Sequence, residues 1–333
     1  MVVSKSHLVI PADFGDSVSA TFVDRDYVVC GTLLGKIWLY KFDRNSRILI
    51  AGYSDDSVRG VYVEDGTIFA TIGDQCCKRI QVSDPIDQLE TKFDRRSSSS
   101  GFKYVIQKFN QVTIVYPGMT TFVDVSTNEQ NMCPFKMQQP LVLNICPLDA
   151  FQNLILLSEF PSTSADPSAE EVRAHRKLKI VDVAAGLTRF ELVEPMVTLA
   201  QLINDKIMIY CVGNTVLVFN FVEKKQIQCL KRLHGGSAIL ALDSCLPLRG
   251  PEPLTATLAK DGSVRVWDFL TGTVLLGGDV SNFCFSLGFP YLLQVHLGST
   301  PRAVVSSDYG AHVVDLCYSE NVSPIAHPDP SPV

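Results

Sequence analysis

Short apolar runs that recur at a nearly constant spacing restrict the fold of this chain more than any other feature. Apolar residues alternate within each run, and Gly, Asn, Asp or Pro interrupts the runs, which is typical of β-strands. Seven runs share one form, apolar-x-apolar-apolar followed by Asp or a substitute. The third of these apolar residues marks the repeat, at Tyr40, Ile80, Val123, Val181, Phe219, Trp267 and Val314. Long helical patterns are nearly absent, so the sequence predicts an all-β fold built from one repeated unit.

The spacing of the marked positions sets the size and number of the units. The intervals are 40, 43, 58, 38, 48 and 47 residues, and a four-stranded unit of about 40–45 residues fits most of them. The longest interval contains a polar insertion at about 160–177. We therefore expect a single domain of seven units over residues 1–320. Two sandwiches are the alternative, but sandwiches do not repeat at one unit length.

One unit is close to a known signature. Residues 259–272 contain a tight Asp261-Gly262 turn, an alternating strand, Trp267-Asp268 and a Thr-Gly turn. This stretch resembles the WD-repeat signature. The resemblance implies a seven-bladed β-propeller, in which each repeat begins with the outer strand of the previous blade. Residues 6–10 have no blade of their own, so we expect them to supply the outer strand of the last blade. That strand would close the ring and remove its unpaired edges.

The same resemblance implies a structural role for four residues. In the family, a Trp in the third strand, a Ser or Thr in the second, an Asp in the turn between them and a His before the first strand form a hydrogen-bonded network. The matching residues are His234, Thr257, Asp261 and Trp267. A buried indole N–H needs a partner, and the other three side chains can complete the chain of hydrogen bonds. We expect these residues to hold one blade together, not to form a catalytic pair.

Sequence patterns for catalysis and cofactor binding are missing. The chain has no nucleophile elbow, phosphate-binding loop, zinc-protease motif or dinucleotide-binding fingerprint. No pair of Cys or His residues has metal-ligand spacing. We therefore expect no catalytic residue, no metal and no cofactor. An enzyme whose active residues converge on the central channel from several blades is an alternative.

The net charge and the cysteine content of the chain indicate which partners and which cellular location to expect. Lys and Arg total 29 and Asp and Glu total 35, so the net charge is −6, which disfavours nucleic acid as the main partner. Ten cysteines are spread along the chain, mostly in apolar runs, and are expected to be reduced core residues. The N-terminus lacks the pattern of a signal peptide, and no apolar run could span a bilayer. A cytoplasmic or nuclear location follows.

Two polar segments are candidate partner-binding surfaces. The first, residues 92–103, joins the second and third units and contains Arg95 and Arg96. With Ser98 it resembles a basophilic-kinase site, so Ser98 is a candidate phosphorylation site.

The second segment is the insertion, whose basic end contains Arg173, Arg176 and Lys177. Insertions in repeat proteins map to loops, which are common binding surfaces. Residues 321–333 are rich in proline and are expected to be a disordered tail.

These observations favour a non-catalytic protein–protein interaction scaffold, a WD-repeat-like subunit of a multi-protein assembly. The partners expected are other proteins. The alternative is a propeller that binds phosphoinositides at a membrane surface. Proteins of that kind use an Arg pair in a Phe-Arg-Arg-Gly motif, and the nearest match here has one arginine, Arg249.

Overall fold

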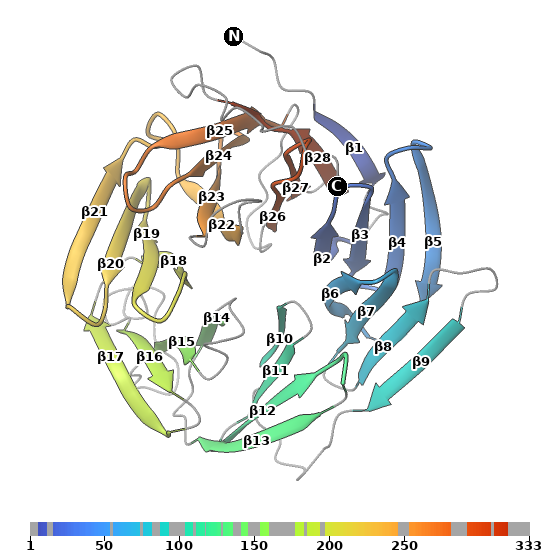
Figure 1. Ribbon diagram of the computed structural model, residues 1–333, viewed down its shortest axis with the longest axis horizontal. Coiled ribbons are helices and arrows are strands. Elements are labelled where there is room, and N and C mark those ends of the chain that lie inside the picture. Colours follow the sequence, from blue (N-terminus) through green and yellow to red (C-terminus); the bar gives the residue numbers. More distant parts are fainter. Residues whose placement is uncertain are drawn as a thin grey trace, which may run out of the picture.

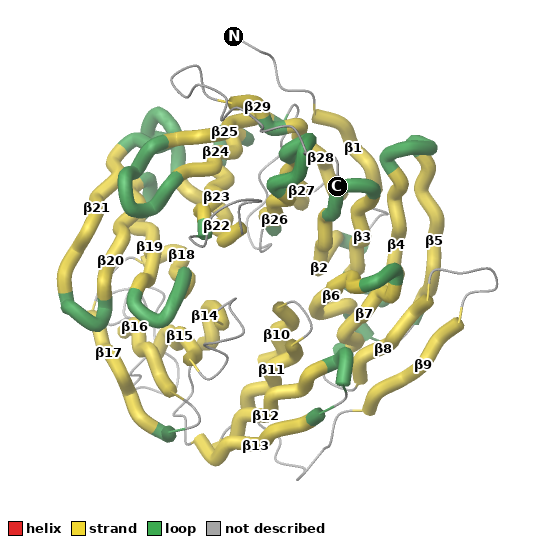
Figure 2. The backbone as a smooth tube through the Cα atoms, in the orientation of Figure 1, coloured by secondary structure: helices red, strands yellow, loops and turns green. Residues whose placement is uncertain are grey.

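The described part of the chain consists of β-strands, turns and loops. In the computed structural model these residues are 6–11, 16–53, 56–73, 76–81, 87–92, 104–108, 111–116, 118–127, 129–135, 141–145, 154–159, 177–182, 185–193, 197–245, 253–280, 292–307 and 310–318. They contain no helix (Figure 2), and so none long and apolar enough to cross a membrane. The strands form seven antiparallel sheets, which confirms the all-β prediction.

Five sheets take their strands in chain order, starting with the strand nearest the centre of the molecule (Figure 1). The first contains β2 (Val18–Val23), β3 (Tyr27–Thr32), β4 (Lys36–Lys41) and β5 (Ser46–Gly52), and the second contains β6 (Val58–Glu64), β7 (Thr67–Ile72), β8 (Cys76–Gln81) and β9 (Asp87–Lys92). The third contains β10 (Tyr104–Lys108), β11 (Gln111–Tyr116), β12 (Gly118–Asp124) and β13 (Gln130–Phe135). The fourth contains β14 (Leu141–Ile145), β15 (Leu154–Glu159), β16 (Lys177–Asp182) and β17 (Leu187–Val193), and the fifth contains β18 (Val197–Leu202), β19 (Ile207–Val212), β20 (Thr215–Asn220) and β21 (Lys225–Lys231).

The last two sheets each include a strand from elsewhere in the chain. The sixth contains β22 (Ile239–Cys245), β23 (Leu254–Ala259), β24 (Ser263–Trp267), β25 (Val274–Asp279) and, at its outer edge, β29 (Cys317–Tyr318). The seventh contains β26 (Leu293–His296), β27 (Arg302–Ser307), β28 (Gly310–Asp315) and β1 (Ser6–Pro11). The N-terminal strand therefore pairs with β28, with Ser6 opposite Val314 and Pro11 opposite Gly310, as the sequence predicts.

The seven marked positions all lie on the third strand of a sheet, and each sheet has one of them. The backbone repeats as well. In five sheets the register of the first strand slips by one residue near its start, at Ser19, Arg59, Leu143, Thr198 and Leu240. Such bulges increase the local twist of a strand. The repeat is therefore preserved in geometry where the side chains have diverged.

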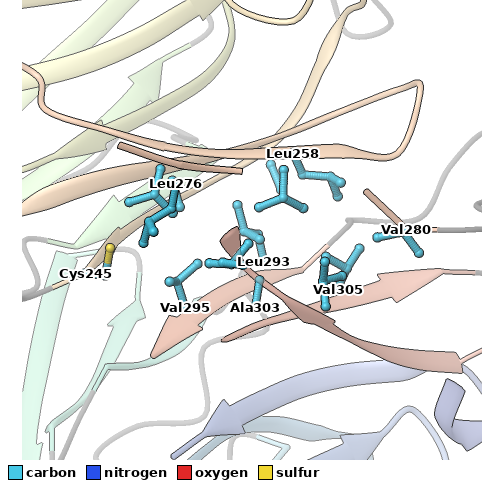
Figure 3. Packing of buried hydrophobic residues seen from close by; sticks show 14 of the residues in the cluster. Cys245, Leu258, Leu276, Val280, Leu293, Val295, Ala303 and Val305 are labelled. Atoms are coloured by element: carbon cyan, nitrogen blue, oxygen red, sulfur yellow. The ribbon is translucent and has the colours of Figure 1, made fainter. Parts of the chain in front are cut away.

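The core lies between neighbouring sheets. Figure 3 shows one such layer, in which Leu258 and Leu276 of the sixth sheet face Leu293, Ala303 and Val305 of the seventh. Buried apolar clusters of this kind recur between other neighbouring sheets, and they account for much of the apolar content of the described residues.

Arg302 on β27 links the seventh sheet to the first. Its guanidinium group donates to the carbonyl of Arg25 at 2.9 Å and to Asp315 Oδ1 at 3.2 Å. It also lies over the ring of Phe42, 4.0 Å from the centroid. Arg25 and Phe42 belong to the first sheet's turns, so this side chain joins the two ends of the chain.

Candidate functional site

One end of the sheets carries most of the candidate functional residues. Neighbouring strands are antiparallel, so in each sheet the turn from the second to the third strand lies at the same end as the entry into the first strand. We call this end the turn face. In three sheets a backbone hydrogen bond joins these two segments: Leu33 N to Ser17 O (2.9 Å), Gly73 N to Ser57 O (2.8 Å) and Lys260 N to Ala238 O (2.8 Å). The turns are thus fixed to the sheet entries.

In the sixth sheet a buried side-chain network reinforces this connection. The Ser263 hydroxyl donates to Asp261 Oδ1 at 2.6 Å. His234 Nδ1 lies 2.6 Å from Ser263 Oγ, and His234 Nε2 lies 2.8 Å from Thr257 Oγ1. Because the Ser263 proton goes to the carboxylate, His234 Nδ1 carries the proton of its hydrogen bond with Ser263. A protonated ring would donate from Nε2 to Thr257, whose hydroxyl would then donate to the Arg265 carbonyl 3.5 Å away. With a neutral ring, Thr257 donates to Nε2 instead.

The ionisation of the network agrees with that arrangement. Burial, together with the nearby positive charge of Arg265, lowers the pKa of His234 to about 4, against the opposing effect of Asp261. Burial opposes ionisation of Asp261, but hydrogen bonds from the Ser263 hydroxyl and amide outweigh it and hold the Asp261 pKa below its usual value. The network is therefore an anionic carboxylate linked to a neutral ring.

The structure joins three of the four residues predicted to form the network and leaves out the fourth. Trp267 is fully buried, yet its Nε1 has no hydrogen-bond partner among the described residues. It lies opposite Thr255 on β23, not Thr257, so the predicted indole contact is not made. Ser263 takes part instead, although it was not among the expected residues. The Asp-Gly-Ser sequence is a signal for it, because a hydroxyl two residues after Asp readily caps the turn.

In the first sheet, Asp16 makes the equivalent connection with different chemistry. It lies just before β2, is 2% exposed, and accepts a hydrogen bond from the Leu34 amide at 2.9 Å. Its second oxygen lies 3.2 Å from Lys36 Nζ. Asp16 was also not expected from the sequence. A signal was present, since the tripeptide Asp-Ser-Val occurs at residues 16–18 and again at 56–58.

The turn that Asp16 holds exposes two leucines. Leu33 is 37% and Leu34 54% exposed. Gly35 follows with a φ of +78°, close to the +85° of Gly262 in the sixth sheet. The two turns thus have the same left-handed glycine, but Leu-Leu replaces Lys-Asp. Apolar side chains at a tip fixed by buried hydrogen bonds are unusual, because turns generally carry polar residues.

Most of the predicted surface residues lie outside the described residues. Arg95, Arg96 and Ser98 fall between β9 and β10, and Arg173 and Arg176 fall between β15 and β16. Both connections leave and re-enter their sheets at the turn face.

The remaining predictions about surface segments have mixed outcomes. Arg249 falls between β22 and β23 in the sequence and also lies outside the described residues, as does the tail 321–333. Lys177 is described, and it is the first residue of β16. Its Nζ is paired with Glu191 Oε1 on β17 at 3.0 Å. It therefore belongs to the sheet and not to the basic end of the insertion, which corrects the boundary expected from the sequence.

A central cavity is the second candidate site. Its volume is about 370 Å³, and residues of β2, β6, β10, β22 and β26 line it. These are the strands nearest the centre in Figure 1. No cluster of three potential metal ligands occurs among the described residues. The lining mixes apolar groups with a few polar ones, as ligand pockets usually do.

Comparison with known proteins supports the fold and leaves the function open. No family model and no curated protein matches the sequence. Among solved structures, 1306 chains are similar to this protein in structure. One is the crystal structure of the computationally designed Ika8 protein, with a TM-score of 0.55 and 15% identity over 91% of this chain and 96% of that chain. At this identity the likeness concerns the fold alone, and one fold hosts many functions.

Proposed function

We propose that this protein is a WD-repeat-like, seven-bladed β-propeller that acts as a non-catalytic scaffold for other proteins in the cytoplasm or nucleus. Support comes from the seven sheets around a common centre and from the pairing of β1 with β28. The network around His234 and Asp261 is a further similarity to the repeat signature.

The observation that carries the scaffold proposal is the rigid turn with exposed Leu33 and Leu34. Binding energy at protein interfaces concentrates in a few apolar or aromatic anchors. An anchor that is already ordered loses little conformational entropy on binding. The Leu34 and Leu33 amides donate hydrogen bonds to Asp16 and to the Ser17 carbonyl, and these bonds order the turn. We therefore assign the leucine pair the role of an anchor for a partner's apolar pocket.

Several strand ends lie at the same end of the sheets as the leucines. In a propeller, the turn faces of all blades lie on one side of the ring. Lys92 and Tyr104, and likewise Glu159 and Lys177, are strand ends at the turn face. The proposal is that partners dock on this side, with the leucines at the centre of the contact.

Affinity purification with quantitative mass spectrometry tests this function. The double variant Leu33→Ser/Leu34→Ser is compared with the wild type and with Val222→Ser. Val222 is 61% exposed but lies in the turn between β20 and β21, at the opposite end. We expect partner recovery to fall about tenfold or more for the leucine variant and to be unchanged for Val222→Ser. Equal recovery with all three proteins would refute the leucine anchor, and no stable protein partner at all would refute the scaffold.

A further inference from the structure

The central cavity contains a positive charge without a partner. Arg59 lines the cavity and makes no hydrogen bond or ion pair with any described residue. It is the extra residue in the bulge of β6, where Val58 pairs with Ile72 and Gly60 with Thr71. Bulges redirect side chains and are frequent beside binding sites. Among the described residues that line the cavity, Arg59 is the one cation.

Two further polar side chains belong to the lining. The half-buried Thr21 hydroxyl makes no hydrogen bond with a described residue, and the buried Gln294 Oε1 has no partner among the described residues. By contrast, Gln107 is fully engaged, since it accepts from Thr71 at 2.6 Å and donates to the Phe69 carbonyl at 3.2 Å. Unpaired polar groups beside a cavity are the groups that a bound ligand would satisfy.

The cavity also contains one carboxylate, which limits the charge of a ligand. Asp243 accepts a hydrogen bond from the Val295 amide at 3.0 Å and is 5% exposed. A carboxyl group accepts hydrogen bonds from hydroxyl groups and, when ionised, repels a second anionic group. The lining is therefore matched to a molecule with one oxyanion and several hydroxyl groups.

We propose that the central cavity is a binding site for a small hydroxylated oxyanion, such as a sugar monophosphate or a hydroxy acid. Arg59 binds the phosphate or carboxylate, as guanidinium groups favour both geometrically. The Thr21 hydroxyl donates to a neighbouring oxygen of the oxyanion, and Gln294 Oε1 and Asp243 accept from the hydroxyl groups. A volume of about 370 Å³ holds a metabolite but no folded partner. This proposal is independent of the docking role of the turn face.

Isothermal titration calorimetry with purified full-length protein tests the site. The probes are glucose 6-phosphate, ribose 5-phosphate and gluconate, with glucose and sodium sulfate as controls at equal ionic strength. We expect at least one of the three oxyanions to bind with a stoichiometry of one and neither control to bind. The dissociation constant should rise about tenfold or more in Arg59→Gln, because a charge-assisted contact is lost.

Arg44→Gln is the matched control. Arg44 is also exposed, but it is in the turn between β4 and β5 and lies 3.6 Å from Asp43, so its loss should leave binding unchanged. The proposal is wrong if none of the three oxyanions binds, if sulfate binds equally well, or if Arg59→Gln and the wild type bind alike. Binding that Arg44→Gln weakens equally would also overturn it, because a general surface charge effect would then explain the signal.

Discussion

At the scale of single residues, the polar network of the sixth sheet shows how the repeat tolerates change. Ser263 links His234 to Asp261, and Thr257 bonds directly to His234, whereas Trp267 only fills the core. The identity of the residues was predictable from their match to a signature. Their exact hydrogen bonds were not, because one added hydroxyl between two partners changes which atoms come within 3 Å of each other.

The neutral state of His234 predicts how stability depends on pH. Its pKa is about 4 in the folded protein, against 6.5 unperturbed, so between these values the unfolded chain binds more protons. Stability is therefore fully present above about pH 6.5, and up to about 3 kcal/mol is lost as the pH falls to about 4. Chemical denaturation across this range should show the loss.

The variant His234→Gln isolates this effect. Burial also lowers the pKa values of His296 and His312, so they contribute a decline with the same sign, and the difference between variant and wild type is the informative quantity. We expect the variant to be less stable at pH 7 but to lose less stability on acidification. Parallel pH profiles for the two proteins would contradict this, because they would show that folding does not change the pKa of His234.

At the scale of elements, the sheets repeat in backbone geometry more faithfully than in sequence. The bulge in the first strand recurs in five sheets, although the bulged residues include Ser, Arg, Thr and Leu. The tight turn before the third strand recurs with Leu-Leu-Gly or Asp-Gly. Apolar spacing and turn glycines predicted the strands for this reason. Bulges were not predictable, because they have no residue preference strong enough to appear in one sequence.

Gly31 on β3 packs closely against β6, the first strand of the next sheet, so a larger side chain at this position should destabilise the protein. A Cβ there would lie 2.2 Å from Val58 Cγ1 on β6 of the next sheet. Gly31→Ala should therefore reduce the free energy of unfolding by about 1–3 kcal/mol through overpacking.

Gly52 at the end of β5 is the control, because nothing lies within 4 Å of its added Cβ. Gly52→Ala should leave stability unchanged or raise it by up to about 1 kcal/mol. Denaturant titration of both variants makes the comparison. Equal effects of the two substitutions would show that the sheets are not packed as closely as the structure has them.

At the scale of the whole molecule, the N-terminal strand completes a sheet whose other three strands come from residues 293–315. β1 supplies the outer strand beside β28, and Arg302 joins that sheet to the turns of the first. The pairing was predictable because a chain that begins with the last strand of a unit leaves its final unit one strand short. The exposed leucines and the unpaired Arg59 were not predictable as sites, because their meaning depends on what folding leaves without a partner.

We propose that the seven sheets form one ring that β1 completes. Hydrogen exchange of the backbone amides tests this ring closure most directly. If the claim holds, amides of β1 and β28 exchange as slowly as those of β24, through unfolding of the whole domain. Removal of residues 1–11 should then speed exchange in β28 and lower the midpoint of thermal unfolding. Rapid exchange of β1 in the intact protein, with β28 unaffected by the truncation, would contradict the claim.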